Sequence, residues 1–133
     1  MDLKILEIAS HTENNKVLEN CTHKSKHKNP ICGDEMEISL VVKGEVVKDM
    51  AYQCKSCVYC QASVSLLSRK IKNKNINQIL AFISHGEELF KDVKFKLDNE
   101  WKSFKKIFNK DNINRKDCLL LPLKTVQKAL EIK

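Results

Sequence analysis

The most regular alternation of apolar and polar residues lies in residues 36–43. Every second position is apolar, which is the period of a β-strand with one buried face. These positions are Met36, Ile38, Leu40 and Val42. Gly44 and Glu45 follow as a tight turn, and residues 46–53 are a second, less regular apolar segment. The pattern therefore predicts a β-hairpin.

After the hairpin, apolar residues recur every three or four positions, which is the period of an amphipathic helix. Helices are expected over residues 58–72, 76–84 and 119–132, with a short one over 3–9. Pro122 lacks a backbone N–H and is tolerable only in the first turn of the last helix. Residues 87–108 are expected to form one broken helix or two. The polar residues 10–29 are expected to form a long loop.

A hairpin followed by several helices predicts the α+β class, with a small antiparallel sheet packed against the helices. The chain has 133 residues, which suits one domain with a single hydrophobic core. We therefore expect residues 1–133 to form one domain.

The charge pattern argues against a nucleic-acid partner. The net charge is +7, from 24 basic and 17 acidic residues, but the basic residues are spread along the chain. None of the eight aromatic residues (one Trp, two Tyr and five Phe) lies within the basic runs at residues 24–28 and 70–74, whereas a nucleic-acid surface combines the two. No apolar run approaches the roughly 20 residues of a membrane helix. The start, MDLKILEIAS, does not read as a secretory signal, so we expect a cytoplasmic protein without a membrane partner.

Six cysteines are the main chemical signal in this chain. They are Cys21, Cys32, Cys54, Cys57, Cys60 and Cys118. In a reducing compartment, disulfides are rare and cysteines more often bind metal or carry reactive sulfur.

Cys54, Cys57 and Cys60 form a C-x2-C-x2-C run, which is similar to the start of a bacterial ferredoxin motif. That motif needs a fourth cysteine three residues later, and Val64 and Ser65 follow here instead. A zinc site would need a second pair of closely spaced cysteines. Two alternatives remain open at this point: a small iron–sulfur electron-transfer protein that uses this run, and a zinc-binding interaction module.

A second set of candidates lies at the ends of predicted elements. Cys32 lies in a turn with Pro30 and Gly33 just before the first strand, and Asp34 is two residues further on. Cys57 follows the second strand, and Cys118 precedes the last helix. The start of a helix favours a thiolate over a thiol. If these four residues share a metal, their Cβ atoms should lie within about 8 Å of one another.

These residues stand in segments that resemble the U-type iron–sulfur scaffolds, which comprise IscU, SufU and the N-terminal domain of NifU. The segments are NPICGDEMEISLVVKGEVVKD from Asn29, Gln61-Ala62-Ser63 after Cys57, and Arg-x-x-Cys from Arg115 to Cys118. The resemblance covers residues 29–133 well. Residues 1–28 match weakly and are expected to be mobile.

Within the family the chain looks most like SufU. The 61-residue step from Cys57 to Cys118 and the arginine at position 115 are typical of that branch. Asp117 stands where IscU-type proteins have a histidine. Cys54 and Cys60 occupy positions that are usually small residues in the family. We interpret them as small buried residues, or as auxiliary ligands or sulfur relays.

The resemblance implies that Cys32, Asp34, Cys57 and Cys118 bind zinc, iron, or a transient [2Fe-2S] or [4Fe-4S] cluster. It implies a scaffold or sulfur-acceptor role rather than an enzyme, although a sulfurtransferase-like role is compatible with it. The expected partners are a cysteine desulfurase of the SufS or IscS type and apo iron–sulfur acceptor proteins. Cys32 is then the candidate persulfide acceptor and Cys118 the alternative.

Three thiolates and one carboxylate around a divalent ion leave a net charge of about −2. Lys55, Arg115 and Lys116 are the cations expected to offset it.

Overall fold

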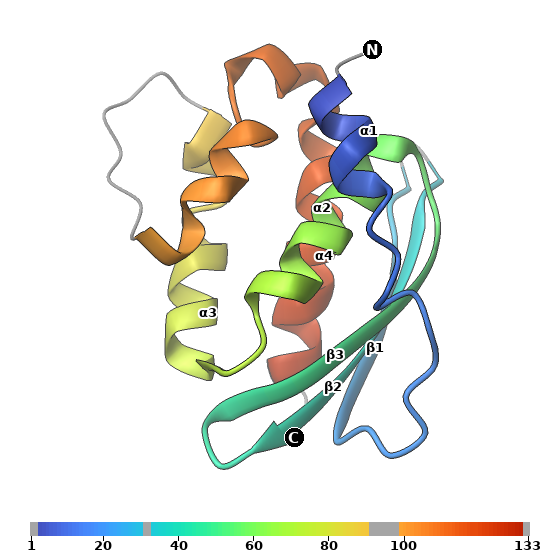
Figure 1. Cartoon of the computed structure of the whole chain (residues 1–133), viewed down its shortest axis with the longest axis vertical. Coiled ribbons are helices and arrows are strands. Elements are labelled where there is room, and N and C mark those ends of the chain that lie inside the picture. Colours follow the sequence, from blue (N-terminus) through green and yellow to red (C-terminus); the bar gives the residue numbers. More distant parts are fainter. Residues whose placement is uncertain (1–2, 31–32, 91–98, 132–133) are drawn as a thin grey trace.

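The computed structural model describes residues 3–30, 33–90 and 99–131. In chain order its elements are α1 (Leu3–Ala9), β1 (His23–Lys28), β2 (Glu35–Lys43), β3 (Val46–Lys55), α2 (Val58–Lys70), β4 (Lys74–Asn75), α3 (Ile76–Ser84), the 3₁₀ helices η1 (Glu87–Phe90), η2 (Asn99–Lys106) and η3 (Lys110–Arg115), and α4 (Lys116–Glu131). Figure 1 shows a sheet with the helices packed on one side. Among the described helices, none is both long and apolar enough to span a membrane.

The sheet is antiparallel, with strand order β1-β2-β3-β4. The predicted hairpin is present as β2 and β3, in a register that pairs Ile38 with Tyr52. Gly44 turns the chain between them with φ +62°, a conformation that glycine adopts without strain.

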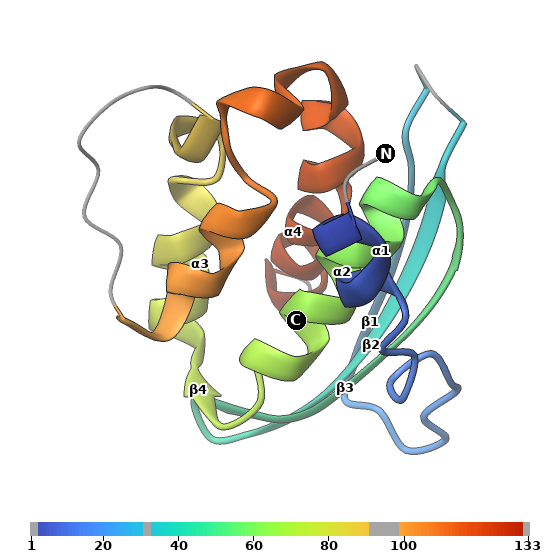
Figure 2. The same cartoon turned by 45° about the horizontal axis from the view of Figure 1, so that its top comes forward.

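One face of the sheet is buried against the helices, as Figure 2 shows. Met36, Ile38 and Leu40 are fully buried, which confirms the predicted inner face of β2. They belong to one hydrophobic core that also takes in residues of α1, α2, α3 and α4. The α+β fold class predicted from the sequence is therefore confirmed.

The predicted loop over residues 10–29 is wrong in its last part, because His23–Lys28 form the edge strand β1. The strand has no apolar alternation to reveal it. Its inward-facing Ser25 is buried and donates a hydrogen bond of 2.6 Å to the Thr125 carbonyl of α4. On the outer face, Lys24 and Lys28 form ion pairs with glutamates of β2.

The last helix begins three residues earlier than predicted, at Lys116. Pro122 therefore lies in the second turn, not the first, so the usual backbone bond from position 122 to the Cys118 carbonyl is not formed. The predicted helices at 58–72 and 76–84 are present as α2 and α3. Residues 87–90 and 99–106 form short 3₁₀ helices, and residues 91–98 lie outside the described part of the chain.

Candidate metal centre

Three of the four predicted site residues come together in space. One ligand atom each of Asp34, Cys57 and Cys118 lies within 4.8 Å of the others. The three come from different parts of the fold: the loop before β2, the start of α2 and the first turn of α4. The fourth, Cys32, lies outside the described residues.

The turn between β1 and β2 places Asp34. The Asn29 N–H donates to the Asp34 carbonyl at 2.8 Å, and the Gly33 N–H donates to the Asn29 carbonyl at 2.8 Å. Gly33 has φ +77°, so this position strongly favours glycine. The turn leaves the Asp34 side chain with only 8% of its surface exposed.

The Asp34 carboxylate is suited to bind a metal. Its Oδ2 atom is buried and has no hydrogen-bond partner among the described residues. Leaving a polar atom in this state costs free energy, and almost all buried polar atoms in proteins are paired. A cation held together with the two thiolates would satisfy this oxygen, so the residues present fit a metal.

Cys57 ends the connection from β3 to α2 and is the N-cap residue of that helix. Its carbonyl accepts the Gln61 N–H at 3.0 Å, which starts the helical hydrogen bonds. The Gln61 side chain also donates to the Ser56 carbonyl at 2.9 Å. The Cys57 side chain makes no capping hydrogen bond, so the cap does not occupy its sulfur.

Cys118 lies inside the first turn of α4 rather than before the helix, and only 6% of its surface is exposed. Packing of α2 against α4 brings it near Cys57. Between these helices, the buried Ser63 hydroxyl donates to the Leu119 carbonyl at 2.6 Å. This bond joins the residue next to Cys118 to the second turn of α2.

The cations predicted beside the site differ in their surroundings. The Arg115 guanidinium carbon lies 5.2 Å from the centroid of the Tyr59 ring. Lys116 is half-buried, and Lys55 is exposed. No pattern in the sequence points to Tyr59, because its proximity to Arg115 arises only when the chain folds.

The remaining two cysteines of the C-x2-C-x2-C run have different positions. Cys60 is fully buried in α2, and Cys54 is half-buried on the inner face of β3, opposite Met36. Burial raises the pKa of both thiols, and the nearby Asp34 and Cys57 charges raise it further, whereas the Ser56 hydroxyl acts against this. Neither belongs to the group of described residues that could hold a metal ion. The geometry therefore favours the second candidate set over the ferredoxin-like run.

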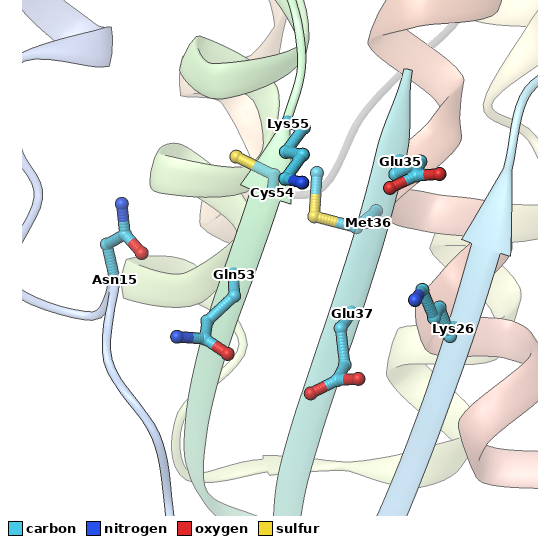
Figure 3. A pocket seen from close by; sticks show the side chains of 8 residues that line it. All are labelled: Asn15, Lys26, Glu35, Met36, Glu37, Gln53, Cys54 and Lys55. Carbon is cyan, nitrogen blue, oxygen red and sulfur yellow. The ribbon is translucent and has the colours of Figure 1, made fainter. Parts of the chain in front are cut away.

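A hollow of about 390 Å³ lies along β1, β2 and β3 (Figure 3). It is lined by Asn15, Lys26, Glu35, Met36, Glu37, Gln53, Cys54 and Lys55. Its lining includes two lysines and two glutamates, so their charges largely cancel. This hollow is less suited to metal chemistry than the buried Asp34, Cys57 and Cys118.

The family model described as "NifU-like N terminal domain" matches residues 2–99. The chain belongs to this family. The match extends the resemblance seen in the sequence to residues 2–28, which include α1 and β1.

Two relatives in this family bear functional names. The chain is 31% identical over 130 residues to the iron–sulfur cluster assembly scaffold protein IscU of Thermotoga maritima, covering 96% of this chain and 89% of that protein. It is 29% identical over 65 residues to the zinc-dependent sulfurtransferase SufU of Bacillus subtilis, covering 49% of this chain and 42% of that protein.

Solved structures agree on the fold. A SufU protein of Fervidobacterium islandicum AW-1 superimposes with a TM-score of 0.89 at 24% identity, covering 98% of this chain and 96% of that chain. A NifU-like N-terminal protein of Brucella abortus superimposes with a TM-score of 0.83 at 22% identity, covering 97% and 90%. The family and the fold predicted from the sequence are thus both confirmed.

Proposed function

We propose that this chain is an iron–sulfur cluster assembly scaffold or sulfur acceptor that binds metal through Cys32, Asp34, Cys57 and Cys118. The observation that carries the proposal is the convergence of Asp34, Cys57 and Cys118, with their ligand atoms within 4.8 Å of one another. The names of the Thermotoga and Bacillus relatives support it.

The mixed set of ligands suits a site that must release what it binds. Zinc and ferrous iron both accept thiolate and carboxylate ligands. The carboxylate of Asp34 is a harder and weaker ligand for a soft iron–sulfur unit than a fourth thiolate. A bound metal would supply charge that holds thiolates and sulfide together, and Asp34 would make their exchange easier.

Sulfur would arrive as the persulfide of a cysteine desulfurase. A thiolate of this chain attacks the outer sulfur, the S–S bond to the desulfurase breaks, and the desulfurase cysteine leaves as a thiolate. Cys118 is 6% exposed, which limits a partner's access to its sulfur. Cys32 therefore stays our preferred acceptor. Apo iron–sulfur proteins in the cytoplasm would take the product, and sulfur transfer by the chain would be sulfurtransferase-like.

The test compares metal and sulfide content per chain after anaerobic reconstitution of two variants. Asp34→Ala removes the weak carboxylate ligand, so we expect metal or cluster retention to change strongly. The double variant Cys54→Ser with Cys60→Ser removes only thiols outside the proposed set, so it should bind as the wild type does. If the double variant loses its metal and Asp34→Ala binds normally, the ligands are the local cysteine run and the proposal is wrong.

A further inference from the structure

The contact between Tyr59 and Arg115 joins the two segments that supply the cysteines of the candidate site. Tyr59 lies in the first turn of α2, two residues after Cys57. Arg115 is the last residue of η3, three residues before Cys118. The guanidinium carbon is 5.2 Å from the ring centroid, which is within the range of a cation–π interaction.

Tyr59 and Arg115 differ in how their surroundings fix them in place. Tyr59 is partly buried and packs against the hydrophobic core. Arg115 is exposed, but its backbone belongs to a segment fixed by side chains. Asn109 caps η3 by accepting the Asp111 N–H at 3.1 Å, and the buried Asn112 amide donates to the Ile107 carbonyl at 2.8 Å. The ring is thus a fixed platform for the exposed side chain of Arg115.

We infer that Tyr59 is a positioning residue that holds Arg115 and thereby keeps Cys57 and Cys118 at ligating distance in the metal-free protein. This inference rests on the proposed function, since it assigns a role at the same site. A metal that leaves the site would then rebind to a preformed pair of thiolates.

The test is a double-mutant cycle with two readouts. The first is the dissociation constant for zinc, measured by competition with a chromophoric chelator. The second needs no metal: it is the rate at which a short bifunctional thiol reagent links Cys57 to Cys118 in the apo protein, identified by peptide mapping. We expect Tyr59→Leu and Arg115→Gln each to weaken zinc binding about two- to fivefold, the size of an exposed cation–π contact, and to slow the linking reaction.

The double variant distinguishes loss of the Tyr59–Arg115 contact from separate effects of the two substitutions. If the contact is the cause, the double variant should be no worse than either single variant. Tyr59→Phe keeps an aromatic face and Arg115→Lys keeps a cation, so both should restore most of the wild-type behaviour. Additive effects, or a Tyr59→Phe variant as impaired as Tyr59→Leu, would overturn the inference.

A matched control is the second cation–π pair, in which Lys74 Nζ lies 5.4 Å from the centroid of the Trp101 ring. Lys74 follows α2, whose 13 residues span about 20 Å, so it lies far from Cys57. Lys74→Gln should leave both readouts unchanged. Wild-type protein that binds neither zinc nor iron would contradict the proposed function, but the linking reaction would still decide the role of Tyr59.

Discussion

At Asp34, the feature that would favour metal binding lowers the stability of the metal-free protein. A buried carboxylate oxygen without a partner lowers the stability of the metal-free protein, whereas a bound metal would use that oxygen. The spacing of Asp34 from Cys32 already indicates that it is a candidate ligand. The spacing does not reveal the unpaired oxygen, because burial depends on how distant parts of the chain pack around Asp34.

Asp34→Ala should therefore stabilise the metal-free protein, by about 1 kcal/mol, because it removes an unpaired buried polar group. Denaturant unfolding of the apo protein measures this. Asp49→Ala is the matched control: the Asp49 carboxylate forms an ion pair with Lys72 at 3.3 Å and accepts the Met50 N–H at 2.8 Å. Its loss should lower stability slightly. A destabilised apo Asp34→Ala variant would mean that the carboxylate supports the fold itself.

Among the elements, those with a clear apolar period were predicted well. β2, β3, α2 and α3 lie close to their predicted bounds, because each buries one face that the sequence shows directly. β1 was missed because HKSKHK has no apolar alternation, and its strand conformation comes from pairing with β2. The start of α4 was misplaced because Lys116 and Asp117 are polar, and the helix begins there to pack against η3 and α2.

Two buried serines attach α4 to different neighbours, and this allows a controlled test. Ser63 donates to the Leu119 carbonyl from α2, beside the candidate site, and Ser25 donates to the Thr125 carbonyl from β1. Replacing either by alanine should cost about 1 kcal/mol of unfolding free energy. Only Ser63→Ala should also weaken zinc binding, because it loosens the contact that sets the Cys57–Cys118 distance. Equal zinc affinity in both variants would show that this distance does not depend on the Ser63 bond.

At the scale of the whole molecule, the candidate ligands connect parts of the chain that are far apart in sequence. Asp34, Cys57 and Cys118 belong to the turn before β2, the start of α2 and the start of α4. The sequence identified these residues through their places at element ends and through the family resemblance. Their convergence could not be derived from spacing, because it depends on how α4 packs against both α2 and the sheet.

Removing the metal should therefore loosen the whole fold and not one loop. Binding to the native state alone adds about 2.7 kcal/mol of stability when free metal is 100 times its dissociation constant. The melting temperature should then fall by several degrees when a chelator strips the protein, and it should recover when zinc is restored. Thermal melting of wild type and Asp34→Ala, with metal content measured at each step, tests this. The variant should show a smaller difference, because its site binds metal through fewer ligands. An unchanged wild-type melting temperature after confirmed metal removal would mean that the metal does not contribute to folding, and that the ligand-bearing segments are held together without it.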